Sequence, residues 1–246
     1  MNDLEKYFTE NTGRSAHKWQ HYFDIYDKHF SRFRGTDVHI VEFGVSDGGS
    51  LQMWKNYFGP KCKIFGVDIN EHCKTLEEDG VQIFIGDQEE REFLRSLVKK
   101  IPRIDILIDD GGHRMRQQIN TFEELYPAVS KDGVYLCEDV HTSYWAGWGG
   151  GGYKNRGTFI EYSKNFIDYI NAWHSQTPKL MVTDFTKSAK SLHFYDSIVL
   201  IEKGVVDKPF HIRTGPVHVE SYKQPRGMVA RLKEKIKTFK NKFYIK

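Results

Sequence analysis

Residues 104–113 read Ile-Asp-Ile-Leu-Ile-Asp-Asp-Gly-Gly-His, and residues 136–139 read Leu-Cys-Glu-Asp. Each stretch is an apolar run that ends in acidic residues, which is typical of a buried strand carrying carboxylates to the edge of a sheet. Open α/β sheets bind their ligands at that edge. Clustered carboxylates suit a hard divalent cation such as Mg²⁺, and the imidazole of His113 suits proton abstraction. Together the two stretches predict metal-assisted activation of a hydroxyl group.

Strand-like and helical patterns alternate along the chain from Val38 onward. The expected strands cover residues 38–43, 63–68, 81–85, 104–108 and 133–138, and the expected helices run through Tyr57 and over residues 71–78, 89–100, 116–126 and 159–173. Such alternation specifies an α/β fold with a mostly parallel sheet and helices on both faces. Residues 192–194 and 198–202 predict an antiparallel hairpin that closes the sheet.

Residues 1–37 are expected to form an N-terminal helical segment, because aromatic residues recur every three or four positions from Trp19 to Phe33. We expect this segment to pack on the domain body, where it could form one wall of a pocket. It also offers a surface for homo-oligomer formation, which the sequence leaves open. The other predicted parts are a single domain over residues 38–203, a linker over 204–225 and a basic tail over 226–246.

The composition predicts a soluble cytoplasmic protein. The 246 residues are 39% apolar, enough for one sizeable core. We find neither an apolar run of membrane-spanning length nor the basic and apolar regions of a signal peptide. Cys62, Cys73 and Cys137 are odd in number and lack metal-type spacing, so we expect reduced thiols in a reducing compartment.

Charge is concentrated in the tail. Residues 226–246 carry a net +7, so the remainder of the chain carries −4 of the overall +3, and we expect no binding of nucleic acid. Apolar residues recur at intervals of three or four in this tail, at Met228, Leu232, Ile236, Phe239 and Phe243. Two interpretations stand: a basic helix lying on the inner face of an anionic membrane, and a solvated, partly disordered end.

The turn after the first strand, residues 42–50, reads Glu-Phe-Gly-Val-Ser-Asp-Gly-Gly-Ser. A dinucleotide fingerprint requires glycine where Ser46 stands. The stretch also matches G-x-S-x-G, but a hydrolase elbow needs strands before it, and this turn follows the first strand. A third pattern, the acidic-x-Gly-x-x-x-Gly turn of S-adenosylmethionine enzymes, fits Glu42, Gly44 and Gly48. This third interpretation explains more residues than the other two.

The next two strands also end in polar residues. Asp68 ends the second strand, where a carboxylate can accept both hydroxyls of a ribose, and Asp87 and Gln88 follow the third, where they can contact an adenine. Acids at strand ends often cap helices instead. Four strands that end in acid at one edge make capping an insufficient explanation.

Three blocks of sequence, at residues 42–54, 108–113 and 138–145, resemble those of class I S-adenosylmethionine-dependent methyltransferases. Within that family they are similar to the metal-dependent sugar O-methyltransferases of the macrolide-sugar and polysaccharide types. The resemblance covers roughly residues 38–203. It implies a Rossmann-like fold and Mg²⁺-dependent transfer of a methyl group from S-adenosylmethionine to a sugar hydroxyl of a glycan, glycolipid or glycosylated metabolite.

The resemblance also implies a role for each site residue. It assigns His113 as the base, Asp110, Glu138 and Asp139 as metal ligands, and Glu42, Gly44, Gly48, Ser50, Asp68, Asp87, Gln88 and Asp109 as the donor-binding residues. A lone histidine in this position would more simply be a turn residue, but its spacing from Asp110 favours catalysis. Adjacent Glu138 and Asp139 would repel each other without a cation.

The segment after Asp139 is the expected wall over the acceptor. Tyr144 and Trp145 are candidates for stacking on a sugar face, with plain loop packing as the alternative. The glycine run over residues 149–152 predicts a hinge, because no Lys-Ser or Lys-Thr follows it to make a phosphate cradle. Two other functions remain open: methylation of a catechol-like diol, and a non-catalytic binding module with the same fold.

Overall fold

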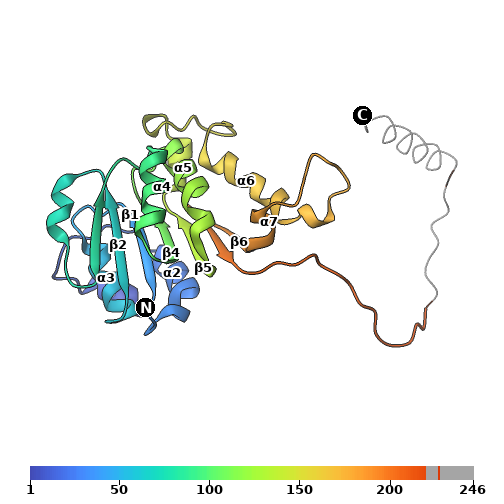
Figure 1. Cartoon of the computed structure of the whole chain (residues 1–246), viewed down its shortest axis with the longest axis horizontal. Helices are drawn as coiled ribbons and strands as arrows, with labels where there is room; N and C mark the ends of the chain where they lie inside the picture. Colours follow the sequence, from blue (N-terminus) through green and yellow to red (C-terminus); the bar gives the residue numbers. More distant parts are fainter. Residues whose placement is uncertain (220–226, 228–246) are drawn as a thin grey trace. The chain divides into compact units, whose positions relative to one another are not determined.

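A computed structural model describes residues 1–219 and Gly227 of the chain. Within these residues one sheet of seven strands has the order β3-β2-β1-β4-β5-β7-β6 (Figure 1). The strands are β1 (His39–Phe43), β2 (Lys63–Asp68), β3 (Val81–Ile85), β4 (Ile104–Asp109), β5 (Val129–Cys137), β6 (Ala189–Tyr195) and β7 (Ile198–Lys203).

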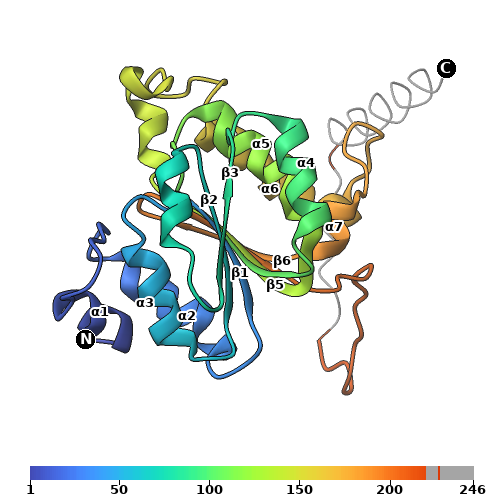
Figure 2. The ribbon, with the colours of Figure 1, turned by 60° about the vertical axis from the view of Figure 1, so that its left-hand side comes forward.

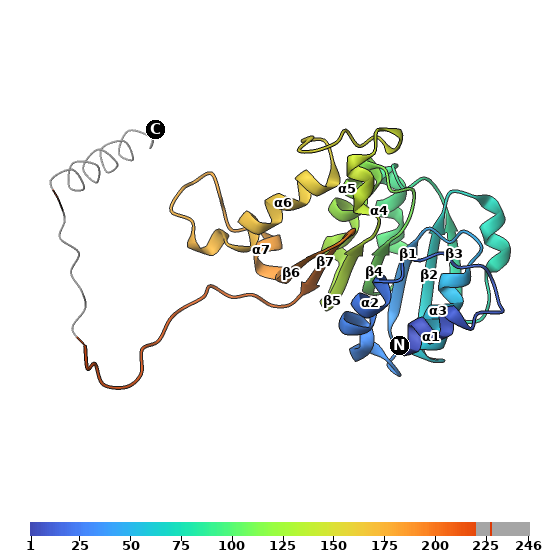
Figure 3. The same ribbon diagram turned by 180° about the vertical axis from the view of Figure 1, so that it is seen from behind.

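Strands β1 to β5 pair in parallel, and β7 is antiparallel to both β5 and β6. Figure 3 shows β6 and β7 beside β5, seen from behind. Phe43 of β1 pairs with Asp109 of β4, and Asp109 pairs with Cys137 of β5. The carboxyl ends of these strands therefore meet at one edge. The predicted Rossmann-like sheet with a closing antiparallel hairpin is confirmed.

Helices cover both faces of the sheet (Figure 2). The helices of one face are α1 (Asp3–Thr9), α2 (Tyr22–Phe30) and α3 (Gly49–Phe58), and those of the other are α4 (Arg91–Lys100), α5 (Met115–Leu125), α6 (Phe159–Ile170) and α7 (Asp184–Ser188). All six residues of β4 are buried, because helices cover both of its sides. The sheet is thus held rigid beneath its ligand-binding edge.

Several predicted boundaries need correction. Trp19 lies before α2, which begins at Tyr22. The first residue of the recurring aromatic pattern is therefore not part of the helix. The helix expected over 71–78 is a 3₁₀ helix, Glu71–Leu76. The helix expected to reach Trp173 ends at Ile170, where a short 3₁₀ turn follows. The first and third errors lie at helix ends, where local hydrogen bonding overrides the apolar pattern, whereas the second concerns the type of the whole helix.

Residues 1–208 form one compact unit, so the N-terminal segment packs within it. A second unit begins at Pro209, and its residues 209–219 contain no helix or strand. The predicted basic tail over 226–246 lies outside the described residues, apart from Gly227. Within the described part of the chain, every helix is too short or too polar to cross a membrane.

Candidate active site

A cavity of about 480 Å³ lies at the carboxyl ends of the parallel strands. Its walls come from the loops after β1 to β5 and from residues 15–18 of the N-terminal segment. The predicted site residues that line it are Gly44, Ser50, Asp68, Asp87, Gln88, Asp110, His113 and Asp139. The edge of the sheet that the sequence indicated is therefore hollow, and loops far apart in the chain meet there.

Glycines in the turn after β1 allow this close meeting of loops. Gly44 has a φ of 88°, and a side-chain carbon there would lie 2.0 Å from the backbone oxygen of Asp110. Gly48 has a φ of 77°, in the left-handed region that favours glycine. At Gly49 an added carbon would lie 2.2 Å from the backbone oxygen of Ser15. The turn thus brings β4 and the N-terminal segment against the start of α3.

Glu42 braces the first turn from inside the protein. Its carboxylate accepts hydrogen bonds from the Ser50 hydroxyl at 3.0 Å and from the Trp54 indole at 3.1 Å. The residue is fully buried and does not line the cavity, and burial raises the pKa of Glu42 to about 7. Its predicted role in donor binding stays a prediction, and any such role acts through the turn that it holds.

Asp68 ties β2 to the same turn. One of its carboxylate oxygens accepts the backbone N–H groups of Val45 and Ser46 at 2.9 and 3.1 Å. The other oxygen accepts the N–H of Asn70 at 2.8 Å. These bonds fix the carboxylate at the cavity wall, where the sequence places a ribose contact.

Gln88 links the loops after β3 and β4. Its amide donates to Asp109 at 2.6 Å, and its oxygen accepts the backbone N–H of Gly112 at 3.1 Å. Asp109 is buried and does not line the cavity, and burial raises its pKa to about 7. The structure therefore places Asp109 behind the cavity wall, whereas the sequence predicted that it faces the donor. Asp87 lines the cavity directly.

Asp110, His113 and Asp139 converge at one end of the cavity. One potential ligand atom from each lies within 4.8 Å of the others. The His113 Nε2 atom is 3.6 Å from an oxygen of Asp139 and 3.9 Å from an oxygen of Asp110. His113 and Asp139 both adopt left-handed backbone conformations, with φ of 53° and 52°. Such conformations are uncommon outside glycine and concentrate at functional sites.

Lys18 completes the cluster, although no sequence motif predicted it. Its side chain is only 2% exposed, and its ammonium lies 2.5 Å from Asp110, 2.9 Å from Glu138 and 3.9 Å from Glu42. Burial opposes its charge, but these three carboxylates outweigh that effect and raise the pKa of Lys18 well above its usual value. The N-terminal segment thus delivers a permanent cation to the acidic edge of the sheet.

Two tyrosines of α2 hold the neighbouring acids. Tyr26 donates to Glu138 at 2.6 Å, and Tyr22 donates to Asp139 at 2.6 Å. Glu138 is 1% exposed and shares its second oxygen with Lys18, so it lies behind the group formed by Asp110, His113 and Asp139. The role of Glu138 as a metal ligand stays a prediction. Metal binding by this oxygen would require the Lys18 ammonium to move away from it.

The cluster carries more negative than positive charge. Burial raises the pKa of Asp110 to about 7 and that of Glu138 to about 8, although Lys18 pulls both values down. One ammonium cannot neutralise these acids together with Glu42 and Asp139. The site therefore favours bound protons or a further cation, and hard carboxylate oxygens suit Mg²⁺.

His113 is suited to accept a proton. Burial lowers its pKa below the usual value for histidine, so the ring is neutral at neutral pH. Its Nδ1 atom is buried and has no hydrogen-bond partner within the described residues. The ring of Trp148 lies 5.8 Å from the imidazole. The His113 ring presents its other nitrogen, Nε2, to the Asp110 and Asp139 carboxylates, and a neutral imidazole nitrogen in that position can act as a general base.

The predicted acceptor residues lie outside the cavity. Tyr144 and Trp145 are each 49% exposed, and Trp145 packs edge-on against His141 at 4.5 Å. The ring of Trp148, which was not among the predicted residues, lies beside that of His113. The segment that carries these aromatics is the predicted one, but the structure places a different ring beside the base.

Several known proteins are similar to this chain in sequence and in fold. No protein-family model matches the chain. The mycinamicin VI 2''-O-methyltransferase of Micromonospora griseorubida is 33% identical over 216 residues, which cover 82% of this chain and 52% of that protein. A tetracenomycin-C rhamnosyl 3'-O-methyltransferase of Streptomyces olivaceus is 34% identical over 76% of this chain and 50% of that protein.

A solved structure of MycE, a methyltransferase of mycinamycin biosynthesis in complex with Mg and SAH, is 30% identical to the chain with a TM-score of 0.76. The match covers 83% of this chain and 55% of that one. The chain therefore has the fold of the class I methyltransferases, and its sequence is similar to theirs. A second MycE structure, which also contains mycinamycin VI, has a TM-score of 0.75 and covers 95% of the chain. The chain spans about half the length of the curated relatives it matches.

Proposed function

We propose that this methyltransferase transfers a methyl group from S-adenosylmethionine to a sugar hydroxyl, with Mg²⁺ as a second cofactor. One observation carries the proposal: a neutral His113 lies within 4 Å of the Asp110 and Asp139 carboxylates at one end of the cavity. The named relatives are sugar O-methyltransferases, and the MycE complexes contain Mg and SAH. The cluster supplies the base and the ligands that such a reaction needs.

The donor fits the part of the cavity nearest β1 and β2. Gly44 and Gly49 line this part, and α3 begins at Gly49, where the first N–H groups of a helix have no acceptor within the helix itself. Asp68 is fixed at the wall by backbone donors, where it can accept the ribose hydroxyls. We propose that Ser50 and Asp87 line the same pocket around the donor.

Mg²⁺ fits the other end of the cavity. Asp110 and Asp139 offer hard oxygens, with Glu138 as a third candidate, and the acids outnumber the one buried cation that faces them. When bound, the ion would polarise the acceptor hydroxyl and lower its pKa.

His113 performs the proton transfer in this proposal. A sugar hydroxyl is a weak nucleophile unless its proton is removed as the oxygen attacks the sulfonium methyl group. The neutral ring accepts that proton, while the sulfur takes the electron pair of the broken carbon–sulfur bond. Trp148 limits the freedom of the ring, and Tyr22 orients Asp139 beside it.

The acceptor is a carbohydrate or glycoconjugate in this proposal, such as a glycan or glycolipid of polysaccharide biosynthesis. Exposed aromatic rings at Tyr144, Trp145 and Trp148 lie on the segment after β5 and offer flat surfaces for a sugar. We further propose a cytoplasmic enzyme that contacts the inner face of a membrane through its basic tail, supported by the pattern of basic and apolar residues in 226–246. Homo-oligomer formation through the N-terminal segment is a further proposal.

Calorimetry and turnover test the reaction. S-adenosylmethionine should bind the protein as purified, and turnover on a panel of glycosides should disappear in EDTA and in Asp110→Ala. Asp184→Ala, which changes a fully exposed acid on α7, serves as the matched control and should retain turnover. Full activity in EDTA would reject the metal role, and absence of donor binding would reject the whole proposal.

A second comparison tests the acceptor. Sugars and catechols offered side by side should yield methylated product with the sugars. Methylation of the catechols alone would replace the sugar acceptor with a small diol while leaving the base and the metal in place.

A further inference from the structure

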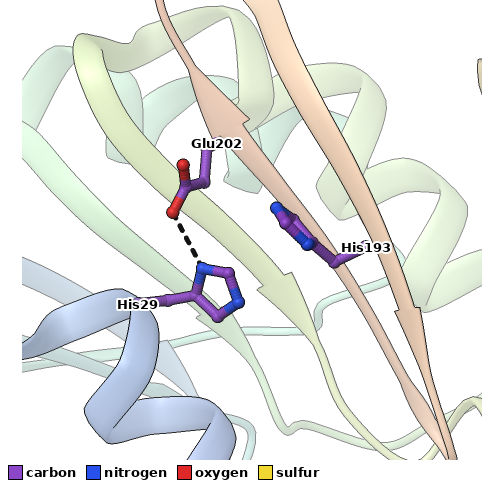
Figure 4. Close-up of side chains that lie close together, drawn as sticks. All are labelled: His29, His193 and Glu202. Carbon is purple, nitrogen blue, oxygen red and sulfur yellow. Dashed lines mark hydrogen bonds and ion pairs between the residues drawn. The ribbon is translucent and has the colours of Figure 1, made fainter.

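A second group of metal-ligating side chains lies away from the cavity. His29 of α2, His193 of β6 and Glu202 of β7 face one another in Figure 4. One ligand atom from each lies within 4.8 Å of the others, and the His29 Nδ1 atom is 2.8 Å from the Glu202 carboxylate. The two imidazole rings are 4.5 Å apart. We name these three residues the hairpin cluster.

Hydroxyl groups hold the far side of each histidine. The Tyr195 hydroxyl is 2.8 Å from Nε2 of His29, and the Ser191 hydroxyl is 3.0 Å from Nε2 of His193. In each ring this leaves Nδ1 to bind a metal, which at His29 would replace the 2.8 Å contact of that nitrogen with Glu202. Histidines that bind metals usually have the other ring nitrogen held in this way, because the hydrogen bond fixes the tautomer and the ring orientation.

We propose that the hairpin cluster binds a zinc-class transition-metal ion. Two imidazoles and one carboxylate are a common ligand set for Zn²⁺, with a fourth position left for water. The same set is a poor match for Mg²⁺, which prefers oxygen ligands. The three ligands come from three separate elements, and His29 is 2% exposed, so folding brings the set together.

Nearby positive charges are the main argument against this site. The Arg32 guanidinium is 3.2 Å from the same Glu202 oxygen that contacts His29, and the Lys28 ammonium is 3.2 Å from the Tyr195 hydroxyl. The Arg32 side chain is 43% exposed, so it can turn to solvent. Arg32 neutralises Glu202 in the metal-free protein, and the bound ion would take over that role.

The position of the site suggests what the ion would do. His29 lies three residues after Tyr26 and seven after Tyr22, so all three side chains share one face of α2. The two tyrosines hold Glu138 and Asp139 of the active site. An ion that ties α2 to the hairpin would therefore fix the helix that orients the catalytic acids.

Zn²⁺ uptake by purified protein tests the proposal, with a chromophoric chelator as competitor. Asp110→Ala is the background, because it removes a ligand from the active-site cluster, which could also bind Zn²⁺. In that background the protein should retain one equivalent of Zn²⁺, and adding His193→Ala should reduce this to none. No uptake in the background, or uptake that His193→Ala leaves unchanged, would overturn the proposal.

Two further measurements separate loss of a ligand from loss of the fold. Circular dichroism and melting in EDTA should show that the His193→Ala variant is folded. Arg32→Ala keeps all three ligands and removes the competing cation, so it should bind Zn²⁺ more tightly than the background protein. Weaker Zn²⁺ binding by Arg32→Ala would mean that the three residues form only a hydrogen-bonded network with the arginine.

Discussion

The active-site cluster and the hairpin cluster, which both combine histidine with carboxylate side chains, differ in composition and in charge. The active-site cluster combines His113 with Asp110 and Asp139 on loops after parallel strands, whereas the hairpin cluster combines two histidines with Glu202 on regular elements. In the first, the Glu42, Asp110 and Glu138 carboxylates lie within 4 Å of the buried Lys18 ammonium, and Asp139 is a fourth acid beside His113. One arginine matches one carboxylate in the second.

The composition and charge of each cluster determine which ion it can hold. An excess of buried carboxylates needs a hard cation to be stable in its charged form, so the active site can be both charged and reactive. A charge-balanced group of imidazoles needs no ion to fold and binds one through softer nitrogen ligands. The first arrangement supports chemistry, and the second supports the position of a helix.

The largest expected effect comes from His113→Gln, which removes the base and keeps a polar side chain. We expect kcat to fall by about 10²- to 10⁴-fold, the range typical of a general base. Calorimetry should show that donor and Mg²⁺ binding persist. His174→Gln is the matched control, since this ring is exposed and lies outside the cavity. A kcat for His113→Gln close to that of the control would exclude the proton-transfer role.

The next effect tests whether the charge excess is real. Lys18→Met removes the buried ammonium, and we expect the free energy of unfolding to fall by about 3–5 kcal/mol at pH 8, as for a broken buried ion pair. Mg²⁺ should restore much of this loss because it can pair with the same acids. Lys203→Met is the control, because that buried lysine donates to the backbone oxygens of Tyr126 and Val129, and Mg²⁺ should not rescue it. Equal rescue of both variants would contradict the assignment.

The pH dependence of stability should separate the two clusters further. The folded-state pKa values of Asp110 and Glu138 are raised to about 7 and about 8, so the folded protein binds more protons than the unfolded chain in the range below these values. The stability contributed by these protons is complete below the unfolded pKa values, falls progressively as the pH rises from there, and is lost once the pH has passed through 7 to 8. Melting temperatures in EDTA should therefore fall across this range. Mg²⁺ should reduce the fall and release protons on binding, whereas an identical fall with Mg²⁺ would exclude these acids as its site.

The sequence predicts the sheet and half of the active site for a clear reason. In residues 104–113 and in residues 136–139, a strand pattern is followed directly by the acidic residues of the site. Because β4 and β5 are parallel neighbours in the sheet, the carboxyl ends of these two strands lie side by side. The glycine turn at Gly44 and Gly48 was recognised in the same way, because it must follow a strand and open a helix.

The missed residues have no local pattern of this kind. Lys18 lies in an irregular segment between α1 and α2, and only the packing of that segment against the start of α3 brings it to the acids. The hairpin cluster joins positions 29, 193 and 202, whose spacing matches no metal motif. Trp148 was adjacent to the predicted aromatics, but choosing it required the path of a glycine-rich loop. Long-range packing decides all three cases.

The smallest effect concerns the hydroxyl that contacts His29. Tyr195→Phe keeps the ring and removes one hydrogen bond of 2.8 Å, so in the Asp110→Ala background we expect Zn²⁺ affinity to fall by about 10-fold. The same substitution in otherwise unchanged protein should leave the Mg²⁺ dependence of methyl transfer as it was, because Tyr195 does not line the cavity. Chelator competition and turnover against Mg²⁺ concentration measure the two quantities. If Tyr195→Phe altered the Mg²⁺ dependence and spared Zn²⁺ affinity, the hydroxyl would serve α2 alone, and the distinction between the two clusters would fail.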